Sequence, residues 1–440
     1  MIKKIIPILV LPFFLLISGC EKNIKELSLI DQNHQLFLSN KFQKKILINK
    51  KYHKIIDNEY NQKFIKPWQL TKNQAHKKKL LWGFNHFKNK KGYAENKQKY
   101  KKKWLEKLKS NTNSNTYPNL IKKGITVHTA NLRALPTDKP FYKNFNNEGE
   151  GYPFDKIQIT SIPIGTPLFL EHQSKDGEWI FVQSTLASGW VKIRDIAFCS
   201  NQFIKSYKNN KGYIAIIDEN ISIKTKNKRF IFKANIGNIF PLIRIGKYNY
   251  AIKVPIKNSN QFAILKEVYL KKKHGTKKPY KITLENLINQ SNKLIKQPYG
   301  WGGLYNNRDC SSLIRDLFAP FGIWLPRNSK YQASTMGTQL DISMLNNGQK
   351  EKFIIDNAPP YLTLLWFPGH IMLYIGHKEN KAFIFHNIWG LKTKDKLKRK
   401  LIGKSIISDL NIGINQNNIK KETMLLNRIK TMTLITPYLK

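Results

Sequence analysis

Cysteine is scarce in this chain of 440 residues, which contains only Cys20, Cys199 and Cys310. No spacing of cysteine and histidine resembles a structural zinc site, so we expect neither a metal nor another cofactor. Cys199 follows Phe198 in a strand-like run, and we expect it to be buried. Cys20 and Cys310 are then left for other roles.

Acidic residues are also few: 28 aspartates and glutamates face 76 lysines and arginines, which gives a formal net charge of +48. Such a balance favours anionic partners, namely nucleic acid, anionic lipid, or wall polymers that carry carboxylate or phosphate groups. The alternative is that the charge reflects the overall composition and not a partner, because lysine, asparagine and isoleucine are abundant together and the lysines are scattered. No arginine-rich element or nucleic-acid-binding motif is present, so we expect no nucleic-acid partner.

Long hydrophobic runs are absent except at the N-terminus, where Lys3-Lys4 precede an apolar run over residues 5–17. This run is too short to span a bilayer and is typical of a secretory signal over residues 1–19. The segment Ile17-Ser18-Gly19-Cys20 resembles a lipobox. We therefore expect export, cleavage before Cys20 and a lipid anchor in a bacterial membrane; ordinary cleavage, with Cys20 incidental, is the alternative.

The rest of the chain predicts an α+β multidomain protein. Residues 20–117 are expected to form a tether, up to about residue 39, and a helical cap packed on the neighbouring domains. Short strands and frequent turns predict a first small barrel over 118–199, with Asp176-Gly177 as a hairpin turn, and a second over 200–275. Residues 280–440 are expected to form an α+β domain.

A glycine-rich loop over residues 298–307 leads to Cys310, and an apolar pattern of helical period follows at Leu313, Ile314, Leu317 and Phe318. Cys310 is therefore expected at the N-terminus of a buried helix, where the helix dipole would lower the thiol pKa. The alternative is a small buried core cysteine.

Two histidines complete the candidate site. His370 begins one predicted strand and His386 lies in the next. A hairpin closed over residues 377–379 would pair residue 373 with 383 and would place the two histidines directly opposite each other on one face. One imidazole could then take the thiol proton while the other fixes its tautomer.

The motifs Tyr-x-Trp-Gly-Gly, from Tyr299, and Asp-Cys-Ser-x-Leu, from Asp309, resemble those of the NlpC-type cysteine peptidases, which are papain-like. The Gly-His strand, the later histidine and the run Leu-Pro-Arg-Asn-Ser over 325–329 also match. Upstream, residues 124–137 and 149–155 resemble the branch with two SH3-like domains before the peptidase. Ser312 departs from the family, which commonly has glycine there.

The resemblance implies hydrolysis of bacterial cell-wall stem peptides between D-γ-glutamate and the diamino acid. Cys310 would attack, His370 would act as base and then acid, and His386 would orient His370. The Cys310 backbone N–H would help to hold the oxyanion, and Tyr299 would line the site. Two other functions remain open, an acyltransferase or lipid-acting thiol enzyme and a non-catalytic wall-binding lipoprotein.

The resemblance also implies a preference for stems with a free N-terminal L-alanine, whose amine Asp309 and Ser311 would hold. Glu150 and Asp155, in the first barrel, could contribute to the same pocket. The alternative reading of Asp309 is a plain helix cap.

Overall fold

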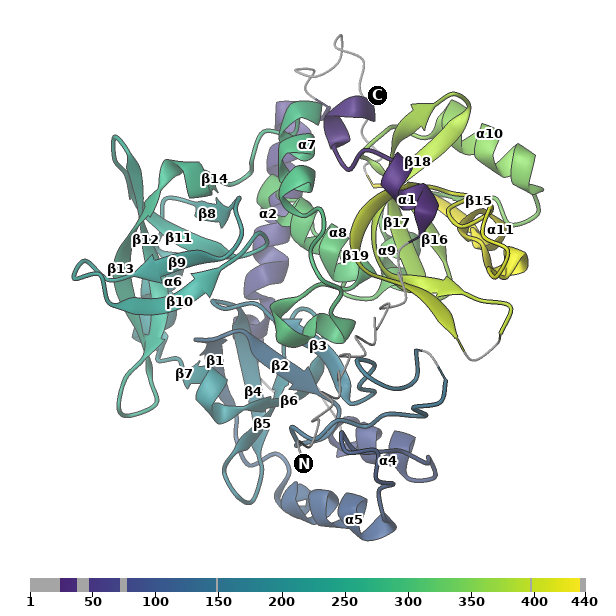
Figure 1. Cartoon of the computed structure of the whole chain (residues 1–440). Coiled ribbons are helices and arrows are strands. Elements are labelled where there is room, and N and C mark those ends of the chain that lie inside the picture. The colour runs from purple at the N-terminus through teal and green to yellow at the C-terminus, as the bar shows by residue number, and fades with distance from the viewer. Residues whose placement is uncertain (1–23, 38–46, 72–76, 148, 396–397, 436–440) are drawn as a thin grey trace, which may run out of the picture.

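The computed structural model describes residues 24–37, 47–71, 77–147, 149–395 and 398–435. They form a helical N-terminal region, two small β domains and a carboxy-terminal α+β domain (Figure 1). The predicted signal segment with Cys20 lies outside these residues. Within the described part of the chain, no helix is long and apolar enough to cross a membrane.

The first β domain is a seven-stranded antiparallel sheet in the order β3-β2-β6-β5-β4-β1-β7. Its strands are β1 (Lys122–Thr126), β2 (Ala130–Arg133), β3 (Gln158–Ile162), β4 (Pro167–Gln173), β5 (Trp179–Gln183), β6 (Ser188–Lys192) and β7 (Ile196–Phe198). The predicted Asp176-Gly177 turn does connect β4 to β5, and Gly177 there adopts a φ of +75° that glycine allows without strain.

The second β domain follows helix α6 (Asn201–Lys208) and combines a five-stranded sheet, β13-β12-β11-β8-β14, with the pair β10-β9. Its strands are β8 (Tyr213–Ile216), β9 (Ile221–Lys224), β10 (Phe230–Ala234), β11 (Ile239–Ile245), β12 (Asn249–Lys257), β13 (Ala263–Lys271) and β14 (Gly275–Lys277). Both sheets contribute to one apolar core, which includes Ile223, Phe240 and Ile252.

The carboxy-terminal domain is built on a six-stranded sheet in the order β15-β20-β16-β17-β18-β19. Its strands are β15 (Thr338–Asp341), β16 (Thr363–Phe367), β17 (His370–Lys378), β18 (Lys381–Lys392), β19 (Arg399–Asp409) and β20 (Thr431–Leu434). Its helices are α7 (Leu284–Lys293), α8 (Cys310–Phe318), α9 (Ser329–Thr335), α10 (Asn347–Asn357) and α11 (Leu425–Arg428). Alternate strand residues serve two cores: Leu373 packs with α7 and α8, whereas Met372 packs with α10 and α11.

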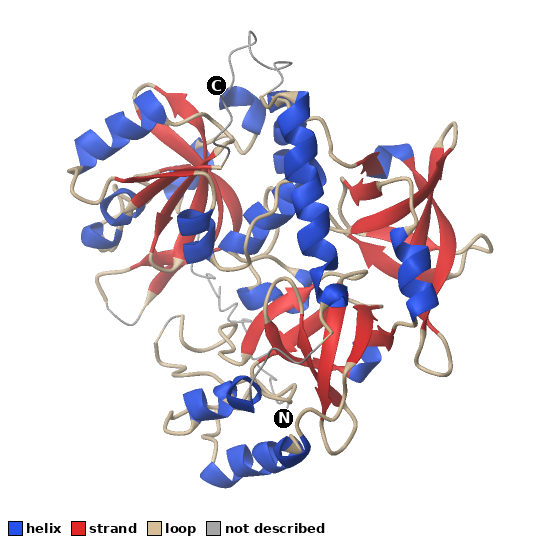
Figure 2. Cartoon of the chain, turned by 180° about the vertical axis from the view of Figure 1, so that it is seen from behind, coloured by secondary structure: helices blue, strands red, loops and turns tan. Residues whose placement is uncertain are grey.

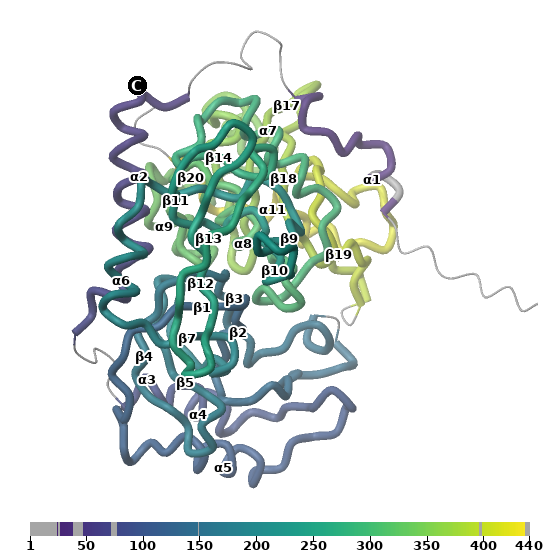
Figure 3. The backbone as a smooth tube through the Cα atoms, turned by 90° about the vertical axis from the view of Figure 1, so that its left-hand side faces the viewer, coloured from purple at the N-terminus to yellow at the C-terminus, as the bar shows by residue number. Residues whose placement is uncertain are grey.

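The N-terminal segment corrects one sequence-based expectation, because residues 24–37 are not a free tether. They contain α1 (Lys25–Leu29) and a 3₁₀ turn at His34–Phe37, and they lie along the carboxy-terminal domain (Figure 3). Ile24 is buried with the α10 core, and His34 is fully buried with its Nδ1 2.8 Å from the Tyr361 hydroxyl. The apolar residues of this segment, which are irregularly spaced in the sequence, thus pack at the edge of the sheet.

Helix α2 (Lys50–Ile65) runs between the other domains and contacts all three, as the view from behind shows (Figure 2). Its His53 Nε2 lies 2.7 Å from the Phe321 carbonyl of the carboxy-terminal domain, and Asp57 forms a buried ion pair with Lys278. Trp68, in the 3₁₀ turn after the helix, donates to the Gly124 carbonyl of the first β domain at 2.8 Å. The predicted packing of N-terminal helices on neighbouring domains is confirmed.

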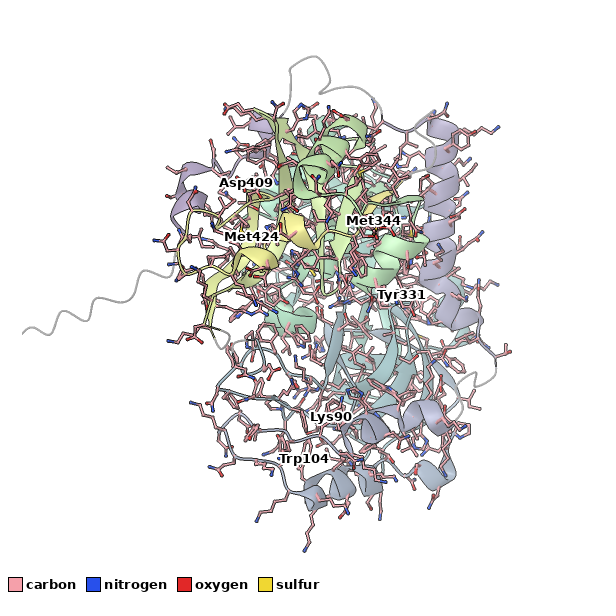
Figure 4. All side chains as sticks on the ribbon, turned by 90° about the vertical axis from the view of Figure 1, so that its right-hand side faces the viewer. Lys90, Trp104, Tyr331, Met344, Asp409 and Met424 are labelled. Carbon is pink, nitrogen blue, oxygen red and sulfur yellow. The ribbon has the colours of Figure 1, made fainter. Side chains whose placement is uncertain are left out.

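The remaining N-terminal helices are α3 (Lys77–Leu80), α4 (Trp82–Phe87) and α5 (Lys102–Asn111), and they cover the first β domain. Trp104 of α5 stacks on Tyr100 with ring centroids 3.8 Å apart. Figure 4 shows Trp104 and Lys90 in this region, at the opposite end of the molecule from Met344 of the carboxy-terminal domain.

Candidate active site

The glycine-rich loop before Cys310 is shaped by its contact with the first β domain. Gly302 and Gly303 have φ values of +58° and +82°, and a Cβ added at Gly303 would lie 2.1 Å from Ser161 Oγ on β3. Trp301 Nε1 donates to the Asp155 carbonyl at 2.8 Å, and Gln158 donates to the Gly302 carbonyl at 3.0 Å. The Trp-Gly-Gly run therefore lets the loop dock against β3, which a side chain at these glycines would prevent.

Helix α8 begins at Cys310, as predicted, and Asp309 is its N-cap. The Asp309 Oδ1 accepts from the Ser312 backbone N–H at 2.9 Å, while the Ser312 hydroxyl accepts from the Asp309 N–H at 2.9 Å. This reciprocal capping box uses the serine that departs from the family's glycine. The apolar positions after Cys310 are buried between α7 and the sheet.

The expected direction of the thiol pKa was wrong for this conformation. Burial, followed by the charge of Asp309, raises the pKa of the Cys310 thiol to about 12. Hydrogen bonds from the backbone of Ile371 and Ser311, together with the charge of Arg327, act in the opposite direction but are outweighed. The free-energy cost of desolvating a thiolate thus exceeds the stabilisation that the helix N-terminus gives it, and the sulfur rests as a neutral thiol.

His370 begins β17, and its Nε2 lies 2.8 Å from His386 Nδ1 on β18. The predicted pairing was wrong by two residues, since Leu373 pairs with Phe385. The turn at Glu379-Asn380, with positive φ at both positions, shifts the register by three residues, and a bulge between Tyr374 and Gly376 reduces that shift to two. A shift of two residues preserves the face of each side chain, so the histidines still meet.

The hydrogen bonds of the histidine pair leave His370 Nδ1 available to accept a proton. If Nε2 of His370 donates to His386 Nδ1, then His386 Nε2 carries a proton toward Ser408 Oγ, which lies 3.3 Å away. Burial, together with the charge of Arg428, lowers the pKa of His370 to about 3, and burial also lowers the pKa of His386. Both imidazoles are therefore neutral, which is the state that a general base requires.

Cys310 and His370 line one cavity of about 310 Å³, which we call the Cys310 cavity. Tyr299 lines it as well, packed between Phe154 and Trp389 at ring-centroid distances of 6.2 and 5.9 Å. Its other charged lining residues are all cations, Lys156, Lys392, Arg399 and Arg428. Among the described residues, no group of three or more metal-ligating side chains is present.

The remaining predicted site residues do not line the Cys310 cavity. Asp309 forms an ion pair with Arg327, whose Nη1 also donates to Ser311 Oγ at 2.8 Å. Glu150 pairs with Lys143 across an exposed loop. Asp155 is buried and pairs with Arg133 at 2.6 Å, within the first β domain. Each of these carboxylates is therefore matched by a cation of the chain itself.

Comparisons with known proteins give the domain order directly. Family models match in turn the NLPC_P60 stabilising domain over residues 8–117, an SH3 domain of SH3b1 type over 140–192, an SH3 domain of SH3b2 type over 200–246, and the NlpC/P60 family over 296–408. A solved NlpC/P60 endopeptidase from Photobacterium damselae subsp. piscicida is 28% identical, with a TM-score of 0.82, over 93% of this chain and 98% of that one.

This chain belongs to the NlpC/P60 family. It is a cysteine peptidase with two SH3-like domains ahead of the peptidase domain, and its fold class is the α+β multidomain arrangement that the sequence predicted. An NlpC/P60 protein from Bacillus cereus ATCC 10987 is 15% identical over 71% of this chain and all of that one, with a TM-score of 0.47. No curated protein matches the chain.

Sequence analysis assigned no role to several residues of this NlpC/P60 site. Arg327 lies in the Leu-Pro-Arg-Asn-Ser run, and its Nε donates to Thr160 Oγ1 of β3 at 2.6 Å, which ties the first SH3-like domain to the start of α8. Ser408 and Asn387 lie on strands whose bounds the sequence predicts only approximately. Arg428 ends the short helix α11, which has only four residues and therefore shows no periodic pattern in the sequence.

Proposed function

We propose that this NlpC/P60 protein hydrolyses bacterial cell-wall stem peptides between D-γ-glutamate and the diamino acid. The observation that carries the proposal is the shared cavity of Cys310 and His370, with His370 Nε2 held 2.8 Å from His386 Nδ1. A nucleophile and a neutral base then face one space open to a peptide, and a buried orienting group holds the base from behind. The murein substrate is supported by the family, whose members cut cell-wall peptides, and by the two SH3-like domains.

The reaction follows from the resting protonation states. His370 Nδ1 takes the Cys310 proton as the sulfur attacks the amide carbonyl, and the imidazolium that forms donates through Nε2 to His386. The backbone N–H of Cys310, at the start of α8, helps to stabilise the oxyanion. His370 then gives its proton to the leaving amine, and water hydrolyses the thioester with His370 acting again as base.

The pH dependence of kcat/KM follows from the lowered pKa of His370 and the raised pKa of Cys310. Because neutral imidazole and neutral thiol are the reactive pair, the acid limb should lie below pH 6.5 and the alkaline limb above pH 9. A profile of kcat/KM from pH 4 to pH 10.5 tests both limits, because kcat/KM should stay level between pH 6.5 and pH 9; any limb that appears belongs to the coupled pair. An acid limb above pH 7 would contradict a base held neutral by burial.

The preference for a free N-terminal L-alanine is a further part of the proposal, and it depends on Asp309 binding the substrate ammonium. Because Arg327 occupies Asp309 Oδ2, a substrate ammonium must share the carboxylate with Arg327 or displace it. Asp309→Asn should therefore raise KM for free L-Ala-γ-D-Glu-diaminopimelate far more than KM for the same stem linked to muramic acid. Steady-state kinetics on the two substrates test this, and equal cleavage of both by the parent would show that no amine pocket exists.

We also propose that Cys20 is lipidated and holds the protein on the outer side of a bacterial membrane. The described chain begins at Ile24, buried on the peptidase domain, only four residues after Cys20. Four residues span at most about 14 Å, so a lipid on Cys20 would hold the peptidase domain close to the membrane surface.

Cys20→Ser should leave an uncleaved or soluble precursor, because the thioether to the lipid forms on that sulfur. Labelling of expressing cells with radioactive palmitate, followed by membrane fractionation, tests this prediction. Incorporation of label into the Cys20→Ser protein would show that the lipid is attached elsewhere.

A further inference from the structure

Arg327 uses all three nitrogens of its guanidinium, and each nitrogen contacts a different residue. Its Nε donates to Thr160 Oγ1 at 2.6 Å, its Nη1 donates to Ser311 Oγ at 2.8 Å, and its Nη2 pairs with the Asp309 carboxylate. Asp309 and Ser311 are the two residues that flank Cys310 in the sequence. One guanidinium therefore holds both neighbours of the residue that carries the nucleophile.

The arginine is itself held in place by burial and by hydrogen bonds. Its side chain is only 11% exposed. Gln332 of α9 is fully buried, and its Nε2 donates to the Pro326 carbonyl at 2.7 Å and to the Ser311 carbonyl at 2.9 Å. These two bonds fix the loop that carries Arg327 against α8, while the buried Thr160 fixes the guanidinium from β3. The cation is therefore preorganised at the start of α8.

The Asp309 carboxylate is bonded on both of its oxygens by groups of the chain itself. Its Oδ1 accepts from the Ser312 backbone N–H at 2.9 Å and from the Ser312 hydroxyl at 2.8 Å, whereas Oδ2 pairs with Arg327. Burial opposes ionisation of Asp309, but the charge of Arg327 and the hydrogen bonds from Ser312 outweigh it and lower the pKa of this carboxyl. Asp309 is therefore ionised at neutral pH, directly beside Cys310.

The charge of Asp309 has opposite consequences for the two reacting groups. It raises the pKa of Cys310, in addition to the larger effect of burial, and so opposes the thiolate. It also raises the pKa of His370, against the larger lowering by burial and by Arg428, and so favours the imidazolium. Arg327 lowers the pKa of Cys310. The ion pair therefore lets the carboxylate support the base while its effect on the nucleophile is reduced.

We propose that Arg327 is a positioning residue for the reaction, which neutralises the Asp309 carboxylate beside Cys310 so that the sulfur can give up its proton and attack. The proton passes from Cys310 Sγ to His370 Nδ1, and the sulfur electron pair forms the bond to the amide carbonyl. Arg327 does not line the Cys310 cavity, so its effect falls on this chemical step and not on substrate binding. The inference rests on the proposed function for the identity of the base and of the peptide.

The reactivity of the Cys310 thiol tests this inference without a peptide substrate. Alkylation by iodoacetamide between pH 7 and pH 10, measured at Cys310 by mass spectrometry of tryptic peptides, follows the thiolate population. Tyr299 also faces the sulfur, and it stays neutral over this range because burial raises its pKa well above the ordinary value. Arg327→Gln should slow the alkylation at least about tenfold, because the charge of Asp309 is then unopposed. Arg327→Gln/Asp309→Asn, which removes both charges, should react at least as fast as the parent.

Two further variants separate the charge of Arg327 from its contribution to stability. Arg327→Lys keeps a cation beside Asp309 and should be alkylated at close to the parent's rate. Lys278→Gln is the matched control, because it breaks a buried ion pair with Asp57 outside the Cys310 cavity, and it should leave the alkylation rate unchanged. Parent-like alkylation of Arg327→Gln, a double variant as slow as Arg327→Gln, or an equally slow Arg327→Lys overturns the inference.

Steady-state kinetics give a second readout and separate this inference from the proposed function. On L-Ala-γ-D-Glu-diaminopimelate, Arg327→Gln should lower kcat at least about tenfold without raising KM, since Asp309 remains and is then open to the substrate ammonium. A raised KM with unchanged kcat would show that Arg327 serves substrate binding, and would overturn the inference. Slow alkylation of Arg327→Gln that the double variant restores, without hydrolysis of any stem peptide by the parent, would retain the role of Arg327 at the thiol and overturn the proposed reaction.

Discussion

Replacing Cys310 by alanine is expected to lower stem-peptide hydrolysis by at least about a thousandfold while leaving the fold intact. Cys310 is the only cysteine among the described residues that line the cavity with His370, and a methyl group fills most of the sulfur's volume at the start of α8. Purified protein assayed on L-Ala-γ-D-Glu-diaminopimelate by mass spectrometry measures the loss, and circular dichroism monitors the fold.

Cys199→Ala is the matched control, because Cys199 is also a partly buried free thiol but lies after β7, outside the Cys310 cavity. It should retain full activity. His370→Ala should lose about as much activity as Cys310→Ala, since members of a catalytic unit are not additive. His386→Asn should keep part of the activity, because an amide can still orient His370. Full activity in Cys310→Ala would refute the mechanism.

The second large effect concerns stability. Arg308→Met should lower the free energy of unfolding by about 3 to 5 kcal/mol, because it leaves the partly buried Glu219 without its cation and removes one of the two arginines that pair with the buried Asp316. The Arg308 guanidinium donates to Asp316 Oδ2 at 2.8 Å and to Glu219 Oε1 at 2.9 Å, and thereby joins the peptidase domain to the second SH3-like domain. Urea unfolding, monitored by tryptophan fluorescence, measures the loss.

Arg244→Met is the control for this change, since Arg244 pairs with Glu267 on the exposed surface of the second SH3-like domain. Its removal should leave the unfolding midpoint nearly unchanged. An Arg308→Met protein as stable as the parent would show that the buried pairs contribute nothing to the docking of the two domains.

The sequence predicted the elements that depend on local pattern. Helix α8 follows from its apolar period and its Asp309 cap. The histidine pair follows from strand alternation, which survived an error of two residues in the register because the side-chain period of a strand is also two.

Features that depend on burial or on distant segments were missed. The helix dipole suggested an acidic thiol, but desolvation in the folded protein dominates and reverses the direction. The resemblance implied that Asp309 would hold a substrate amine, and the ion pair that Arg327 forms with it from a loop after the helix was not foreseen. The cations of the Cys310 cavity are separated by up to 272 positions, from Lys156 to Arg428, and no local pattern links them.

The proposed mechanism has Cys310 and His370 cut one bond in murein stem peptides. Mass spectrometry of muropeptides and free stem peptides, digested with the parent protein and with Cys310→Ala, tests it most directly. The parent should release L-Ala-γ-D-Glu and a peptide beginning with the diamino acid, and Cys310→Ala should release neither. Cleavage at another bond, acyl transfer without hydrolysis, or the same products from Cys310→Ala would contradict it.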